Sequence, residues 1–265
     1  MNVGYAWGSI FMMLLIYSWI KRTSQNKQQM SKLFQGVIFQ LTRWLQIYFQ
    51  KQDETRLENY WRPFLLCITS SSFERTGAFD VTRWISHSYG FGTYIHYIKG
   101  FLDKDTHNKA DQIKKRLLKQ AEGINNRMYI DTIISPSLTS AIAQGIQLPG
   151  ISGKGNNIIL FEYIKSDSQS LEILMHDYAI LKAKPLDICL LRNSLKGFGF
   201  KKEIHLWLTT TDFSNATLII FLGYILIGHP DWKKAEIKVF SIYDTNQLRT
   251  KQNKIKDLIK AGRLP

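Results

Sequence analysis

An uncharged apolar run at the N-terminus constrains this chain more than any other feature. It extends from Val3 to Ile20 and contains no charged residue. About 18 residues in a helix measure about 27 Å, close to the thickness of the hydrocarbon core of a bilayer. Aromatic residues lie near both ends of the run, where the two membrane interfaces would fall: Tyr5, Trp7, Tyr17 and Trp19. We expect residues 1–22 to form a single transmembrane helix.

The charges that follow the run predict its orientation. Lys21 and Arg22 come directly after it, and basic residues flanking a membrane helix stay in the cytoplasm. A cleaved signal peptide would carry a positive charge before the run and a small-residue cleavage site after it, and both are missing. A buried soluble helix remains an alternative, although the run is apolar on all faces. The predicted location is the inner (plasma) membrane, with the C-terminal domain in the cytoplasm.

Residues 23–57 are expected to connect this helix to a soluble domain. Between Met30 and Lys51, apolar residues recur at steps of three and four, which predicts an amphipathic helix. Its apolar face could lie on the membrane, pack against a partner helix or bury against the following domain. The polar stretch Gln50–Asn59 has the composition of a linker. We place a domain boundary near Glu58.

From residue 58 onward, short β-rich runs alternate with helical patterns. Strands are predicted at Pro63–Thr69, Tyr94–Ile98, Ile130–Ser135, Asn157–Ile164, Asp187–Arg192, Glu203–Thr209 and Ala235–Ser241. Helices are predicted at Thr76–Tyr89, Lys104–Gly123, Leu138–Gln147, Ser168–Lys182, Ala216–Gly228 and Asn246–Ala261. The run Ala216–Gly228 is very apolar but too short to span a bilayer, so we expect it in the core. This order indicates a layered α/β domain with a mostly parallel sheet.

The formal net charge of +14 raises the possibility of nucleic-acid binding. The basic residues gather after the apolar run and along helix faces such as Lys114–Lys119. A basic segment beside the membrane is explained by anionic lipid in the inner leaflet, and basic helix faces are usually solvated. No recognition motif organises these residues, so we expect a membrane-lipid contact at the first group and no nucleic-acid partner.

One glycine-rich stretch superficially suggests a phosphate-binding loop. It is PGISGKG, Pro149–Gly155. A P-loop needs Gly-Lys-Ser/Thr between a strand and the helix after it, whereas Gly155 follows Lys154 and a strand comes next. This loop gives only weak support for a nucleotide site.

Other residues with chemical potential do not form a motif. The histidines show no metal-ligand spacing: His87, His96, His107, His176, His205 and His229. His176 and Asp177 are adjacent on a predicted helix and point apart, and Asp212 fits a helix cap. Cys67 and Cys189 lie in apolar strand-like runs and are expected to be small buried hydrophobes. We assign no catalytic, cofactor-binding or metal-ligating residue, expect no cofactor, and predict that the chain is not an enzyme.

Four segments, in order, resemble the C-terminal region of the cation-chloride cotransporter family, which includes sodium-potassium-chloride and potassium-chloride cotransporters. They are NYWRPFLLCIT (Asn59–Thr69), LLKQAEGINNRMYIDTIISPS (Leu117–Ser137), LEILMHDYAILKAKPLDICLLR (Leu171–Arg192) and EIHLWLTTTDFSNATLIIFLGYILIGHPDWKKAEIKVF (Glu203–Phe240). The juxtamembrane stretch Lys32–Leu41 is most similar to bacterial members. The resemblance covers nearly the whole chain.

The resemblance implies a cytoplasmic domain with a fold similar to universal stress proteins, built from two related α/β halves, that dimerises and tunes transport. It implies halves at 58–198 and 199–265, the second incomplete, and makes residues 1–22 the last span of a transporter. The preceding spans, which hold the family's ion sites, are missing, so the chain is expected to be truncated and not to transport alone. The alternative hypothesis is a nucleotide-sensing module of the stress-protein type.

Overall fold

The computed structural model describes most of the chain. The described residues are 3–23, 27–51, 61–122, 126–148, 155–164, 178–194, 197–209 and 215–241, with 172, 249, 252–253 and 255–257 besides. The chain divides into two compact units, one formed by Met1–Arg56 with Ile151–Gly153 and the other by Leu57–Gly150 with Lys154–Pro265.

The first unit contains two helices, α1 (Val3–Thr23) and α2 (Lys27–Lys51). Within the described part of the chain, no helix is both long enough and apolar enough to cross a membrane. The expected transmembrane helix over residues 1–22 is therefore not supported. Strongly apolar side chains are continuous only over Ile10–Ile16, about 10 Å of helix, because glycine, serine and tyrosine interrupt the run on either side.

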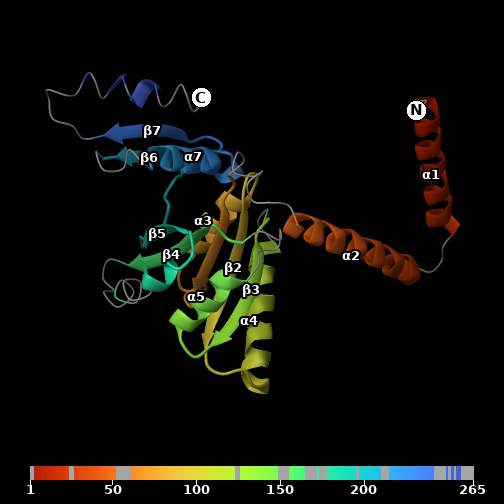
Figure 1. Cartoon of the computed structure of the whole chain (residues 1–265), viewed down its shortest axis with the longest axis horizontal. Helices are drawn as coiled ribbons and strands as arrows, with labels where there is room; N and C mark the ends of the chain where they lie inside the picture. Colours follow the sequence, from red (N-terminus) through yellow and green to blue (C-terminus); the bar gives the residue numbers. More distant parts are fainter. Residues whose placement is uncertain are drawn as a thin grey trace. The chain divides into compact units, whose positions relative to one another are not determined.

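The second unit is built on a five-stranded sheet (Figure 1). Its strands are β1 (Phe64–Thr69), β2 (Phe91–Lys99), β3 (Tyr129–Ser135), β4 (Ile158–Ile164) and β5 (Asp187–Asn193). They lie in the order β3-β2-β1-β4-β5, and every neighbouring pair is parallel. The prediction of an α/β domain with a mostly parallel sheet is confirmed.

Helices cover both faces of this sheet, as a parallel sheet requires. Helices α3 (Gly77–Ser86) and α4 (Lys104–Glu122) pack on the face that carries Leu65 and Cys67 of β1. Helix α5 (Leu138–Gln147) packs on the opposite face, against Leu66 and Ile68. Successive residues of β1 thus point to opposite cores, which explains why the strand is apolar at nearly every position.

A second parallel pair follows the sheet in sequence. It consists of β6 (Glu203–Leu208) and β7 (Glu236–Ser241), connected by α7 (Ala216–Ile227) and the short 3-10 helix η3 (Pro230–Trp232). Helix α7 buries Ile220 against this pair and Ile225 against the core of the five-stranded sheet. The prediction that this apolar run is a core helix is confirmed. The helices predicted at Ser168–Lys182 and Asn246–Ala261 lie largely outside the described residues.

Two neighbouring leucines of α4 test this packing. Leu117 is 0% exposed in the core of the five-stranded sheet, whereas Leu118 is 41% exposed. We expect Leu117→Ala to lower the free energy of unfolding by about 2–5 kcal/mol, because it leaves a cavity. Leu118→Ala should cost less than about 1 kcal/mol. Urea unfolding followed by circular dichroism measures both, and equal losses would contradict the assigned faces of α4.

Candidate functional site

A pocket opens where three strands of the five-stranded sheet end. It measures about 600 Å³ and is lined by residues that end or follow β1, β4 and β5, among them Arg75, Ile164 and Arg192. The connections change direction between β1 and β4, since β2 and β3 lie on one side of this pair and β5 on the other. The carboxyl ends of parallel strands at such a switch point are where doubly wound proteins place their ligands.

A fixed carboxylate joins the three strands near the pocket. Glu162 of β4 accepts hydrogen bonds from Thr69 Oγ1 at 2.5 Å and from Asn193 Nδ2 at 2.6 Å. Helix α3 begins close above, because a Cβ at Gly77 would lie 1.9 Å from Asn193 Oδ1. A larger residue at position 77 would displace the Asn193 side chain, which donates to Glu162. The amino end of α3, with Thr76 and Gly77, therefore lines the pocket.

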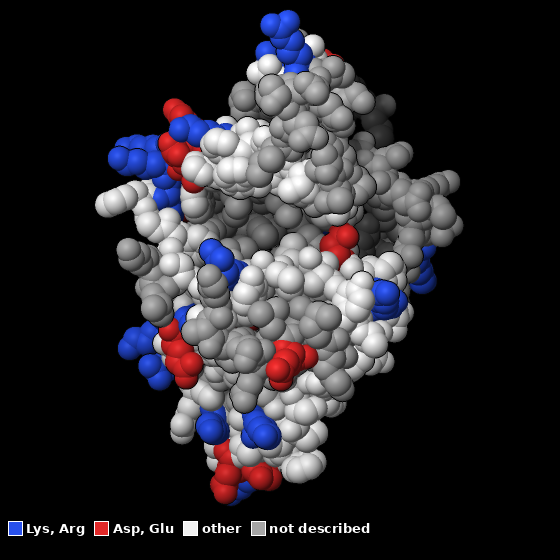
Figure 2. Space-filling model, turned by 90° about the vertical axis from the view of Figure 1, so that its left-hand side faces the viewer, with Lys and Arg blue, Asp and Glu red and all other residues white. Residues whose placement is uncertain are grey.

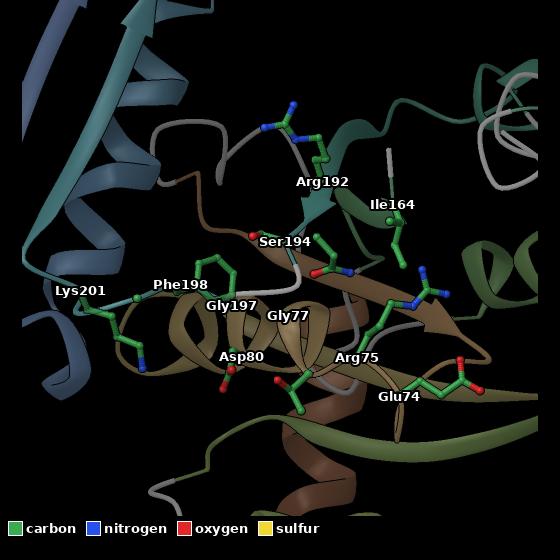
Figure 3. Close-up of a pocket in the computed structure, with 13 residues that line it drawn as sticks. Glu74, Arg75, Gly77, Asp80, Ile164, Arg192, Ser194, Gly197, Phe198 and Lys201 are labelled. Carbon is green, nitrogen blue, oxygen red and sulfur yellow. The ribbon is translucent and has the colours of Figure 1, made fainter. Parts of the chain in front are cut away.

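Three cationic side chains reach the pocket from separate segments (Figure 3). Arg75 comes from the loop after β1, Arg192 from β5, and Lys201 from the segment before β6. Two carboxylates, Glu74 and Asp80, line it as well, so the lining has one more positive than negative charge. The Arg75 Nη1 atom is buried without a hydrogen-bond partner. Together with the positive end of the α3 dipole, this arrangement favours a bound anion.

One ion-pair network joins α3 to the segment that precedes β7. The Arg83 side chain is 4% exposed, and its Nη2 donates to Asp231 Oδ2 at 2.6 Å. The same oxygen accepts from Trp84 Nε1 at 3.0 Å and from Lys201 Nζ at 3.3 Å. His229 lies beside them, with Nε2 3.2 Å from Arg83 Nη1. Because Lys201 also lines the pocket, the pocket and this network share a residue.

The network lowers the pKa values of both Asp231 and His229, for different physical reasons. Partial burial raises the pKa of Asp231, but the hydrogen bonds from Arg83 and Trp84 outweigh it and hold the pKa well below its usual range. Burial, with the neighbouring Arg83 charge, lowers the pKa of His229 to about 4 despite the proximity of Asp231. His229 Nδ1 accepts a hydrogen bond from the Asp231 amide at 3.0 Å. The ring is therefore neutral at physiological pH.

A serine and a histidine also meet inside the domain. Ser72 Oγ lies 2.7 Å from His96 Nδ1 and accepts a hydrogen bond from Tyr94 Oη at 3.0 Å. Ser72 and His96 are both buried, and neither lines the two pockets described for this chain. A substrate could not reach the hydroxyl, so the pair satisfies buried polar atoms and does not form a nucleophile with its base.

The described residues among those singled out from the sequence do not line the pocket. Pro149–Lys154, His176, Asp177 and Asp212 lie outside the described residues. Cys67 is buried and Cys189 half-buried, and burial raises the pKa of both thiols, that of Cys189 to about 11. Within the described ranges, no group of three or more histidine, cysteine or acidic side chains could hold a metal ion.

Sequence reasoning missed the residues that line the pocket. Arg75, Arg192 and Lys201 are far apart in the chain and match no motif. A usable signal was their position, because Arg192 ends a predicted strand and Arg75 follows another. Polar residues at the carboxyl ends of strands that flank a switch point meet in space, but the strand order must be known first.

The fold and the pocket define a doubly wound α/β protein. A scan against protein-family models found no family that matches the chain. A search of curated proteins also found no match.

Neutral His229 makes stability depend on pH. Its pKa rises from about 4 in the folded chain to about 6.5 after unfolding, so the unfolded state binds more protons between these values. Acidification from pH 7 to pH 5 should therefore lower the free energy of unfolding by about 2 kcal/mol through His229. The lowered pKa values of His87 and His96 act in the same direction.

We expect His229→Gln to remove that contribution, so that its urea-unfolding free energies at pH 7 and pH 5 lie closer together by about 2 kcal/mol than those of the parent. His107→Gln, at an exposed position on α4, is the matched control and should keep the parental slope. A parental slope in His229→Gln would show that this ring does not govern acid sensitivity.

Proposed function

We propose that the chain is a regulatory and dimerisation domain of a cation-chloride cotransporter of the sodium-potassium-chloride type, without catalytic activity of its own. The observation that carries the proposal is the presence of two successive parallel α/β units. A sheet in the order β3-β2-β1-β4-β5 is followed by the parallel pair β6–β7 with α7 between its strands. The family resemblance implies two related halves, and two successive parallel α/β units support the proposal.

In this proposal the partner is a transmembrane transport core that the domain regulates from the cytoplasm. Helix α2 is suited to the contact, because its described apolar side chains are exposed, including Val37, Phe39 and Trp44. A helix with so much uncovered apolar surface gains free energy from a partner. The chain itself takes no part in ion coordination, and its influence on coupled transport passes through that partner and through a second copy of the domain.

The charge distribution favours this role over nucleic-acid binding. On the face shown in Figure 2, basic side chains are scattered and interspersed with acidic ones. Several lysines are paired, as in the contacts of Lys114 with Asp131 at 2.8 Å and of Lys238 with Glu203 at 2.6 Å. A nucleic-acid surface instead clusters unpaired basic residues along one face.

The dimer is the most direct test of the proposed function. We expect the full chain to form homodimers that light scattering coupled to size-exclusion chromatography detects, and that a lysine-reactive crosslinker captures at concentrations that leave an unrelated monomeric protein uncrosslinked. Exclusively monomeric chain at high concentration, in detergent and out of it, would overturn the proposal.

A second candidate function is nucleotide sensing, as in stress proteins. The specific observation behind it is the pocket at the switch point, with Arg75, Arg192, Lys201 and the amino end of α3. Backbone amides at a helix start and arginine guanidinium groups are ready-made partners for phosphate. This function would regulate the domain without any chemical step.

Calorimetry with ATP tests this candidate. If the pocket binds nucleotide, the full chain should release heat on titration with ATP. Arg192→Gln should weaken the affinity about tenfold or more, since a charge-assisted hydrogen bond contributes about 1.5–3 kcal/mol. Arg116→Gln, on the exposed surface of α4, should bind like the parent. The absence of heat from the parent would dispose of nucleotide sensing and leave the dimerisation proposal standing.

A further inference from the structure

One exposed aromatic residue lies between two residues whose side chains contact the domain. Phe200 is 93% exposed. Phe198, two residues earlier, packs edge-on against Trp84 with ring centroids 4.7 Å apart, and Lys201 on the other side contacts Asp231. With both neighbours fixed to the domain, Phe200 projects into solvent as a consequence of the fold.

The backbone around Phe200 is specialised for this projection. Gly197 and Gly199 both have φ of 60°, and Lys201 has φ of 52°. A left-handed conformation is costly for a lysine, and the Lys201 side chain contacts Asp231 at 3.3 Å. The alternation turns Phe198 toward the core and Phe200 away from it. Glycine at 197 and 199 makes this reversal possible.

Lysines line a hollow beside the exposed ring. This hollow of about 550 Å³ is lined by Phe200 and by Lys202, Lys233 and Lys234, all exposed. We call Phe200 and these three lysines the basic tip. The Lys202 Nζ lies 5.9 Å from the centre of the Phe200 ring. A single exposed phenylalanine is ordinary, but one flanked by three ammonium groups combines an apolar and an anion-binding element.

The carboxylates near the basic tip do not cancel its positive charge. Asp231 is engaged by Arg83 at 2.6 Å, and Glu203 by Lys238 at 2.6 Å. These two carboxylates line the hollow together with Glu236 and Lys201. Its four lysines and three carboxylates leave one positive charge before the partners Arg83 and Lys238 are counted. Lysines at an anionic membrane contribute attraction in proportion to their number, and an adjacent aromatic ring gains free energy by entering the interfacial layer.

We propose that the basic tip attaches this domain to the surface of an anionic lipid bilayer, with Phe200 inserted at the headgroup level and Lys202, Lys233 and Lys234 bound to lipid phosphates. This site is separate from α1 and α2 and does not depend on the proposed function. Single-stranded nucleic acid would need several stacking rings along a basic groove, whereas Phe200 is the single aromatic residue among those that line this hollow.

The test places a reporter at the tip, because α1 and α2 also expose apolar side chains and binding of the whole chain to vesicles would not be specific. Phe200→Cys in a Cys189→Ser background carries an environment-sensitive nitrobenzoxadiazole label, while Cys67 is fully buried. The matched control is the same label at Phe101→Cys, 76% exposed in the loop before α4. The full chain is titrated with phosphatidylcholine vesicles that contain or lack phosphatidylserine.

We expect the label at position 200 to shift to the blue and brighten only with phosphatidylserine present, and the label at position 101 to stay unchanged. A triple variant of the tip should bind the vesicles about a hundredfold more weakly, about fivefold for each lysine. Its substitutions are Lys202→Gln, Lys233→Gln and Lys234→Gln. The control triple variant on α4, Lys104→Gln, Lys115→Gln and Lys119→Gln, removes the same charge from exposed positions and should keep the parental response.

Three results would overturn the proposal. The first is a label at position 200 that does not respond, or responds equally to pure phosphatidylcholine. The second is a tip variant that binds like the α4 control. The third is the same spectral change with an oligonucleotide, or with glycerophosphoserine in place of vesicles, which would assign the tip to nucleic acid or to a soluble phosphoester.

Discussion

The packing of the parallel pair β6–β7 beside the first sheet depends on one buried guanidinium. Arg83 lies on α3, which packs on the first sheet, and its partner Asp231 lies in η3 before β7. Removing Asp231 would leave the Arg83 guanidinium, which is 4% exposed, with Asp80 as its remaining carboxylate partner. Breaking a buried pair in this way costs up to about 3–5 kcal/mol. The pair therefore fixes where the chain must return after α7. Trp84 adds to this constraint, because it packs edge-on against Trp232 at 5.1 Å.

The pair β6–β7 depends on such contacts for its stability. A two-stranded sheet is at best marginally stable in water, and this one is supported on one face by α7. Helix α7 is itself shared, with Ile220 in the cluster of β6 and Ile225 in the core of the first sheet. Its apolar character on nearly all sides follows from these two contacts, since each face of the helix meets a different core.

Burial of this kind decides which elements the sequence could predict. The strands and helices of the described region were recognisable from periodicity, because β1 and α7 are apolar wherever they meet a core. The pocket was not, since Arg75, Arg192 and Lys201 meet only through the strand order, which no local pattern encodes. The N-terminal run shows a second limit. Its lack of charge predicted a span that the described helices do not support, and strongly apolar side chains are continuous only over Ile10–Ile16.

Helix α3 connects the pocket to the segment that precedes β7. Its first turn lines the pocket with Gly77 and Asp80, and Asp80 contacts Arg83 at 3.2 Å. Lys201 lines the same pocket while it contacts Asp231. An anion in the pocket would attract Lys201 and so compete with Asp231 for its ammonium group. Because such coupling is reciprocal, a movement of η3 that separated Asp231 from Lys201 would in turn change the affinity of the pocket for that anion.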